Sequence, residues 1–498
     1  MKKINLKKTL FVLISGLFLF SQVACDHNSD INNTDNETNQ NEPAPEPTPE
    51  TAPEPVEVTI PTISFNLSNA TALASGDASA ARFARSARAA AEVSASFLQK
   101  VLSDGSIQAA FSIEGGEEPS KWGNLDSVIK SPNGEDYILY FNLPSHTLVT
   151  LEDGSQTNWN LSQLILVHSD NTYEDILLSS PDEIPEYSIR EKDCVQFMND
   201  GSILYVCNDE SFDYYLKRYD PASKDTTELC HLSGGTEDGS SVYIVGFQMS
   251  SDNQYIYLDC QLSNETVSKR YLKVFPLSNP DDSVELGKVK YGLHGWSYNP
   301  YDDCLYYSVR DGEKEEVDDP TRFYTNKIDK TGKEEPVPIL TDKLFCFFLV
   351  PTAADKVWTI FNVGSGQEDE TEVTANIQNI LNEEEIIEFT IPADFYFNEK
   401  YLHVGDIIYL EYQHSIGNNY LQSIYSVDTA SKKGENVMKN VPDWENITLA
   451  SWSVNEESLF ISGTYYTDGS AANYKIDLST LEAIKIDSAT AFASIAAL

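Results

Sequence analysis

The sequence predicts an all-β protein whose main body is a β-propeller of seven four-stranded blades. Three observations predict it. A strand pattern recurs at near-constant spacing over about three quarters of the 498 residues, turn residues stand at fixed places in each repeat, and each repeat contains only strands. Apolar residues make up 41% of the chain, which is enough for a large core.

The repeat is clearest in the second strand of each blade, where Ile, Leu, Tyr and Val alternate. The second residues of these segments are Ile138, Leu204, Ile256, Tyr306, Trp358, Ile408 and Phe460. They are spaced by 66, 52, 50, 52, 50 and 52 residues, and an added loop at 153–158 explains the long first step. Residues 123–487 therefore divide into seven units of about 52 residues.

The blade count has two alternatives. Eight blades result if Val58–Leu67 and Ile107–Ile113 build another blade, and six if the first repeat is misread. The sixth repeat matches the pattern least well, because Phe395–Phe397 and Asp406 stand in a shifted register.

Turn residues punctuate the repeats. Asn, Asp and Gly precede the second strands, as in Ser131-Pro132-Asn133-Gly134 and Asn199-Asp200-Gly201, and third strands often end in an apolar or aromatic residue followed by Asp. These turns resemble the blades of bacterial propellers of the TolB and WD-repeat-like kind. The resemblance implies architecture rather than activity, because such blades occur with unrelated functions. The Trp-Asp signature of WD repeats is missing.

Residues 1–24 predict a signal peptide. Four Lys precede an apolar run of 11 residues, Leu10–Phe20, which is too short for a membrane-spanning helix of about 20 residues. The run ends in Ser21-Gln22-Val23-Ala24-Cys25. Small residues followed by Cys at this place resemble the lipobox of bacterial lipoproteins. That resemblance implies cleavage after Ala24, acylation of Cys25 by palmitate-type chains and attachment to a membrane of the bacterial cell envelope, facing the periplasm or the cell surface.

The lipobox differs from the family pattern at one position. The family prefers Leu three residues before the Cys, where this sequence has Gln22. Ordinary secretion, with Cys25 as a free or bridged thiol, is the alternative. Two or three acyl chains anchor a protein stably, whereas one is marginal.

Residues 25–57 predict a disordered tether. No Lys or Arg occurs between residues 26 and 81, and an Asn-rich part is followed by Pro alternating with Glu and Ala. The Asn-rich part buries too little apolar surface to fold, and the Pro-rich part favours an extended spacer. Such a segment would hold a folded body away from a membrane.

Residues 58–122 predict a strand over Val58–Leu67 and one Ala-rich helix over Ser79–Leu102, ended by Gly105. Three cations, Arg82, Arg85 and Arg88, neighbour each other along this helix. They would pair with the protein's own acids or contact an anionic partner. Residues 488–498 are expected to form a C-terminal tail.

The formal net charge is −44. Removing the first 24 residues, with four Lys and no acid, leaves 30 basic against 78 acidic residues, or −48. This balance excludes sequence-independent nucleic-acid binding and argues against docking on anionic lipid. Membrane contact is therefore expected through the N-terminal lipid alone.

The sequence points to no catalytic residue, metal site or cofactor. It has no nucleophile elbow, P-loop, dinucleotide fingerprint or zinc-protease motif, and its seven His are not spaced as a local metal site. Six Cys lie in or beside predicted strands: Cys194, Cys207, Cys230, Cys260, Cys304 and Cys346. Buried free thiols are favoured there, and a Cys194–Cys207 disulfide stays open.

Large aromatics recur at the ends of predicted first strands: Phe197, Phe247, Trp296, Phe348 and Trp452. They would pack between blades or line a binding surface. His294 and Trp296, in Leu293-His294-Gly295-Trp296, are the candidate ligand-binding residues.

Together these features favour a lipid-anchored, monomeric binding or scaffold module of the envelope with a protein or glycan partner. A propeller lyase or hydrolase acting on glycans or peptides, with carboxylates from several blades converging on the axis, is the alternative. A purely structural surface antigen is a third.

Overall fold

The computed structural model describes residues 63–65, 98–101, 104–111, 124–150, 156–168, 172–177, 187–189, 192–209, 212–235, 240–263, 268–289, 292–310, 323–341, 348–362, 371–417, 419–489, 491–492 and 495–497. All of them belong to one unit, residues 59–313 and 320–498. The predicted signal peptide, Cys25, the tether, the Arg82/Arg85/Arg88 cluster and Cys346 lie outside the described residues.

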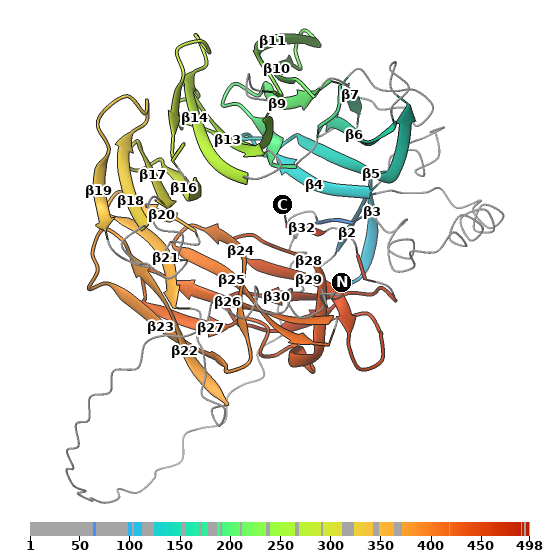
Figure 1. The fold of residues 1–498 in the computed structure, drawn as a ribbon. Coiled ribbons are helices and arrows are strands. Elements are labelled where there is room, and N and C mark those ends of the chain that lie inside the picture. Colours follow the sequence, from blue (N-terminus) through green and yellow to red (C-terminus); the bar gives the residue numbers. More distant parts are fainter. Residues whose placement is uncertain are drawn as a thin grey trace, which may run out of the picture. The chain divides into compact units, whose positions relative to one another are not determined.

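Seven four-stranded antiparallel sheets form the ring of a β-propeller, as the repeat predicts (Figure 1). Within each sheet the strands pair in chain order, so each blade is a simple meander. In Figure 1 the first strands β4, β16, β24 and β28 lie toward the middle of the ring.

The first three blades end before residue 290. Blade one contains β4 (Asn124–Lys130), β5 (Tyr137–Thr150), β6 (Gln156–Val167) and β7 (Tyr173–Leu177). Blade two follows the 3₁₀ turn η2 (Lys192–Cys194) and contains β8 (Val195–Phe197), β9 (Ile203–Asn208), β10 (Tyr214–Asp220) and β11 (Asp225–Leu232). Blade three contains β12 (Ser241–Met249), β13 (Tyr255–Ser263), β14 (Ser268–Pro276) and β15 (Val284–Leu286).

The other four blades complete the ring. Blade four contains β16 (Leu293–Asn299), β17 (Cys304–Arg310), β18 (Phe323–Asp329) and β19 (Val337–Thr341). Blade five contains β20 (Val350–Ala353), β21 (Lys356–Asn362), β22 (Glu372–Asn379) and β23 (Ile386–Pro392). Blade six contains β24 (Tyr396–Val404), β25 (Ile407–Ile416), β26 (Asn419–Asp428) and β27 (Lys433–Asn436). Blade seven follows η4 (Trp444–Asn446) and contains β28 (Ile447–Val454), β29 (Ser458–Tyr465), β30 (Tyr474–Asp477) and β31 (Ala483–Lys485).

The second strands form the core because both of their faces are covered by neighbouring blades. All seven predicted segments lie in second strands, and β9 and β29 are buried over almost their whole length. The buried clusters each span adjacent blades, from blades one to three through to blades six and seven. The second strands therefore carry apolar side chains on both faces, and burial of these side chains between blades holds the blades together.

The Asp that recurs at the end of third strands makes a hydrogen bond to its own turn. Asp220, Asp329, Asp428 and Asp477 each accept a hydrogen bond from the backbone N–H two residues later, at 2.9–3.1 Å. This Asx turn sets the tight connection to the fourth strand, which explains why the sequence repeats an Asp there.

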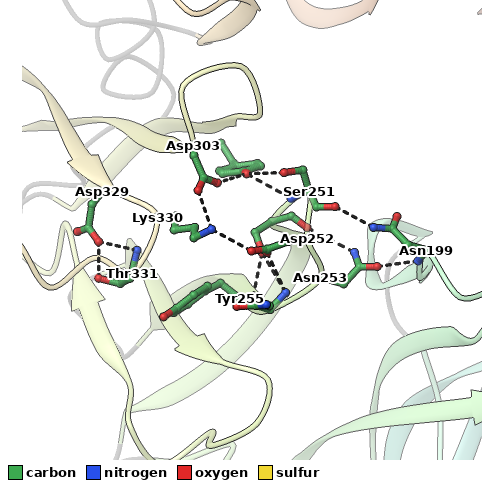
Figure 2. A network of polar contacts seen from close by, with 12 residues as sticks. Asn199, Ser251, Asp252, Asn253, Tyr255, Asp303, Asp329, Lys330 and Thr331 are labelled. Carbon is green, nitrogen blue, oxygen red and sulfur yellow. Dashed lines mark hydrogen bonds and ion pairs between the residues drawn. The ribbon is translucent and has the colours of Figure 1, made fainter.

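Polar contacts join the turns of blades two, three and four (Figure 2). Asn199 Nδ2 donates to the Ser251 carbonyl oxygen at 2.8 Å, and the hydroxyls of Ser251 and Tyr298 lie 3.1 Å apart. Each contact links the first turn of one blade to the next blade, so this end of the ring is held by a chain of turn-to-turn bonds.

Lys330 strengthens the same network. Its Nζ lies 2.9 Å from Asp252 Oδ2 and 2.6 Å from Asp303 Oδ2 (Figure 2). Partial burial alone would raise the pKa of Asp252, but hydrogen bonds from Ser250 and Lys330 outweigh it and hold that pKa down at about 2. Because Lys330 and the two carboxylates bond to one another and to neighbouring turns, this network serves the fold.

The Ala-rich helix predicted over Ser79–Leu102 is wrong at its C-terminal end. Leu98–Val101 forms β2, which pairs with β3 (Ile107–Phe111). Gly105, expected to end a helix, has a φ of +83° and makes the hairpin turn between them. The Asp487 N–H donates to the Gly105 carbonyl oxygen at 2.9 Å, so contact with the last blade favours a hairpin over local helical periodicity.

The chain ends carry further strands. β1 (Ile63–Phe65), inside the predicted strand Val58–Leu67, pairs with β32 (Ile495–Ala497), inside the predicted C-terminal tail. These strands and the β2–β3 hairpin form two-stranded sheets, so they do not build an eighth blade. β32 lies beside β28 and β29 of blade seven.

Candidate functional site

The first strands are bulged at a recurring place. The pairing with the second strand shifts register in β4, β12, β16, β24 and β28. The largest bulge is in blade six, where residues 398–400 stand between Phe397 and Tyr401 and only Glu411 lies opposite them on β25. This bulge is the cause of the shifted register predicted for the sixth repeat.

Glu411 is the centre of a polar cluster between blades six and seven. Its side chain is only 3% exposed. Two residues of the bulge reach it: Asn398 Nδ2 donates at 2.5 Å, and Lys400 Nζ lies 3.2 Å away. From blade seven, Trp452 Nε1 donates to it at 2.5 Å. The bulge thus supplies the donors that a buried carboxylate needs.

Asp259 is the centre of a similar cluster between blades three and four. Its side chain is 8% exposed and forms an ion pair with Arg270, whose Nε donates at 3.1 Å. Trp296 Nε1, from blade four, donates to Asp259 Oδ2 at 3.0 Å. The Trp296 ring also packs edge-on against Tyr257, with ring centroids 6.3 Å apart.

The two clusters follow one plan, and we name them the Asp259 clamp and the Glu411 clamp. In each, a buried carboxylate on a second strand binds an indole N–H from the first strand of the next blade and a cation of its own blade. The acids stand in matching sequences, Tyr257-Leu258-Asp259 and Tyr409-Leu410-Glu411. Because both carboxylates are engaged by cations and N–H donors, neither is free to act as a general acid or base.

Tyr401 on β24 has a raised pKa. Burial raises the pKa of Tyr401 on β24; the charge of Arg270 opposes that rise and the charge of Asp193, in η2, adds to it. The Tyr401 ring also packs on Phe348, with ring centroids 4.6 Å apart.

The inner strand of blade six is also the one with most exposed side chains. Glu399, Lys400, Leu402 and His403 of β24 are exposed, and 40% of Leu402 is accessible. The first strands of blades four and seven, β16 and β28, are mostly buried or half-buried. The inner strand of blade six is therefore more open to solvent than these two.

The structure places the two predicted ligand-binding residues on β16, the first strand of blade four. Trp296 is half-buried and belongs to the Asp259 clamp. His294 stands where the pairing of β16 with β17 shifts register. Burial, with the nearby charges of Arg310 and Arg270, lowers the pKa of His294, which favours its neutral form.

Sequence reasoning did not single out Asp259, Arg270, Lys400 or Glu411. Their partners come from different strands and blades, so no local motif joins them. The repeated Tyr-Leu-acid sequence in two second strands was the available signal, because an acid in the middle of a buried strand needs a partner.

The aromatics predicted at the ends of first strands do pack between blades. Phe247 lies in a cluster that spans blades one to three, Phe348 packs on Phe397 of blade six, and Trp452 is buried against blade six. Packing and, for the two Trp, clamp formation are thus their observed roles.

The described cysteines are free thiols, as favoured from the sequence. Cys194, Cys207 and Cys260 are buried, and Cys230 and Cys304 are half-buried. Burial raises the pKa of Cys207 and of Cys260 to about 12. These thiols are therefore unreactive at neutral pH.

The described residues contain neither a metal-binding cluster nor a membrane-spanning helix. No group of three or more His, Cys, Asp and Glu side chains there could hold a metal ion. Within the same part of the chain, no helix is long and apolar enough to cross a membrane.

Known proteins resemble this chain in structure but not in sequence. No family model and no curated protein sequence matches the chain. Among solved structures it is similar to a puromycin-hydrolysing peptidase of Mycobacterium tuberculosis, with 12% identity, a TM-score of 0.44 and coverage of 74% of this chain and 55% of that one. It is also similar to dipeptidyl peptidase 4 of Porphyromonas gingivalis, with 10% identity, a TM-score of 0.46 and coverage of 79% and 58%.

TolB of Acinetobacter baumannii is similar at 11% identity, with a TM-score of 0.30 and coverage of 67% of this chain and 63% of TolB. The chain spans little more than half the length of the two peptidases. These likenesses concern the propeller fold alone.

Proposed function

We propose that this protein is a lipid-anchored, exported propeller that binds a partner at the centre of its ring. The observation that carries the proposal is the exposed inner strand β24, whose Lys400 belongs to the Glu411 clamp. A rigid ring with one accessible inner strand suits recognition, because little order must be gained on binding.

The arrangement favours binding over catalysis. The two buried carboxylates near the ring centre are held by cations and indole N–H groups, and His294 is near two Arg. Such charge-matched groups position side chains and do not offer the free acid and base pair of a hydrolase or lyase.

Cross-linking at Leu402 tests the binding surface. We expect a photo-reactive residue in place of Leu402 to give an adduct of defined mass in cells of the native organism, because this position is exposed on the inner strand. The same residue in place of Ile386, exposed on the outermost strand of blade five, is the control. Equal adduct patterns at the two positions would place the partner elsewhere on the ring.

The lipid anchor is tested by changing one atom. In a bacterial host given labelled palmitate, we expect the wild type to incorporate label and stay with the membrane pellet. Cys25→Ser should lose the label and move to the soluble fraction, since the sulfur that carries the acyl chain is gone. A soluble wild type without label would show ordinary secretion instead.

A further inference from the structure

We propose that β23, the outer strand of blade five, accepts an extended basic segment of a partner protein as an added antiparallel strand (Figure 1). The inference concerns a second binding surface, at the rim of the ring, and does not depend on the proposed function.

Two backbone hydrogen bonds show which residues of β23 bond to β22. The Asn379 N–H donates to the Glu385 carbonyl oxygen at 2.9 Å, and the Ala393 N–H donates to the Thr371 carbonyl oxygen at 3.1 Å. Both bonds continue the register in which β22 pairs with β23. Because bonded and non-bonded pairs alternate along an antiparallel ladder, the odd-numbered residues of β23 are the ones that bond to β22.

The even-numbered residues therefore point their backbone groups away from the sheet. Ile386, Glu388 and Thr390 each present an N–H and a C=O group at an edge where blade five has no further strand. Their side chains are exposed as well, that of Ile386 by 45%. A strand that pairs with this edge would meet a donor and an acceptor at every second residue, as strand addition requires.

The edge is held in place from one face. Phe389 is buried, and its ring packs on Tyr412 and Tyr425 of blade six, with ring centroids 6.0 Å and 5.9 Å apart. Gly434 of β27 approaches so closely that a Cβ there would lie 2.5 Å from the Phe389 Cβ. Since β23 is fixed on this face, it gains little order when a segment binds its edge.

The other outer strands are shorter or interrupted. β7, β15, β19, β27 and β31 contain three to five residues. β11 contains eight, but its pairing with β10 shifts register next to Leu229. β23 pairs over seven residues without a shift, contains no Lys, and has its one Pro at the last position, Pro392. Short strands, bulges, Lys and Pro protect sheet edges from pairing, so β23 is the outer strand most open to it.

The charges around β23 favour a basic segment. Glu388 lies on the exposed face of β23, and Glu372, at the start of β22, is exposed too. Lys356 and Lys432 are already paired with Glu385, at 3.8 Å and 3.3 Å. A Lys or Arg opposite Glu388 on the added strand would form a cross-strand ion pair.

A second copy of the chain fits this edge less well. Antiparallel self-pairing centred on the strand would put the Glu388 side chain diagonal to that of its copy. Each copy also carries a formal net charge of −44, which repels another copy and attracts a basic partner.

Antiparallel pairing fixes the order of the partner's side chains. The residues opposite Thr390, Glu388 and Ile386 are two positions apart, and they follow in this order from the N- to the C-terminus of the added strand. The segment therefore has a β-branched residue, a cation and an aliphatic residue at every second position.

The test uses the full-length protein in detergent and three fluorescent peptides. The first has the sequence Ser-Thr-Thr-Lys-Thr-Ile-Ser, the second has Glu in place of Lys, and the third carries a methyl group on the backbone nitrogen of Lys. We expect the Lys peptide to bind about fivefold more tightly than the Glu peptide. It should bind about tenfold more tightly than the methylated peptide, which cannot donate to the Glu388 carbonyl oxygen.

Variants of β23 test the two parts of the inference. Glu388→Lys should reverse the preference, so that the Glu peptide binds more tightly than the Lys peptide. Glu228→Lys is the matched control, because Glu228 is an exposed acid on β11, the outer strand of blade two, and should leave the preference unchanged. Thr390→Pro removes an outward N–H and keeps the bonds to β22, so it should weaken binding of the Lys peptide about tenfold, whereas Thr390→Val should not.

The inference is overturned by equal binding of the methylated and unmethylated Lys peptides, by an unchanged preference in Glu388→Lys, or by no binding of the Lys peptide. A dimer in sedimentation that Thr390→Pro converts to a monomer would assign the edge to a second copy instead. Thermal unfolding shows whether a variant has lost its fold, and the methylated peptide tests the edge without any variant.

The outcome at this edge is independent of the ring centre. If both surfaces bind partners, a photo-reactive residue at Ile386 should give an adduct that differs in mass from the adduct at Leu402. An adduct at Leu402 without binding of the Lys peptide supports the proposed function and removes this inference, and the reverse result does the opposite.

Discussion

Replacing Glu411 with Ala is expected to lower the free energy of unfolding by about 3 kcal/mol, because it leaves a buried indole N–H and a half-buried amide without their acceptor and a half-exposed ammonium without its ion pair. The donors are Asn398 Nδ2, Lys400 Nζ and Trp452 Nε1. Urea denaturation followed by tryptophan fluorescence measures the change.

One further variant tests how much of this loss depends on the charge of Glu411, and a second one is the control. Glu411→Gln keeps an acceptor for Trp452 and should cost about 1–3 kcal/mol, the difference between a charged and a neutral hydrogen bond. Glu435→Ala removes an exposed carboxylate that pairs with Lys439 and should change stability by less than about 0.5 kcal/mol. A loss for Glu411→Ala as small as that for Glu435→Ala would mean that the clamp does not hold blades six and seven together.

This clamp has consequences for binding as well as for stability. Lys400 pairs with Glu411 and is also exposed on β24, so a ligand that contacts Lys400 would act on the adhesion between blades six and seven. A ligand that binds Lys400 only in the folded ring should raise the thermal midpoint of unfolding.

The parts of this fold that the sequence predicts are those with a local cause. Alternating Ile, Leu and Tyr mark strands that are buried on both faces, and Asp at the end of third strands makes an Asx turn in each case described, as Asp477 shows with the N–H of Ser479. Both signals need only neighbours in sequence, and both repeat in register with the blades.

The parts that sequence reasoning missed depend on contacts between distant residues. Leu98–Val101 has a helical pattern of apolar residues but pairs as a strand, because its hairpin turn at Gly105 bonds to Asp487, near the other end of the chain. Trp296 was singled out for its position, but its partner Asp259 lies in another blade. No spacing in the sequence encodes that contact.

The C-terminal segment is where we expect the other large effect of a substitution on stability. Each blade is made of consecutive strands, so no strand exchange within a blade joins the first blade to the last. Instead, Phe492 and β32 lie on blade seven. The backbone N–H of Phe492 donates to Ser462 Oγ at 2.6 Å, and Ser451 Oγ donates to the Phe492 carbonyl oxygen at 3.2 Å. β32 then pairs with β1 from the other end of the chain.

Phe492 is the anchor of this segment, because its side chain is fully buried. We expect Phe492→Ala to lower the free energy of unfolding by about 3–5 kcal/mol through the cavity it leaves, and Phe492→Leu by less than about 1.5 kcal/mol. Tyr466→Ala, at an exposed aromatic of the same blade, should change stability by about 0.5 kcal/mol or less.

Hydrogen exchange shows whether Phe492 holds together the two ends of the chain or only fills the core of blade seven. If Phe492 seats the segment that joins the two ends, Phe492→Ala should speed exchange at the paired amides of β1 and β32 far more than at β17 in blade four. An equal loss of protection in β1 and β17 would show that the segment only fills the core of blade seven. The terminal pairing would then be a consequence of ring closure, and the contacts between blades would close the ring by themselves.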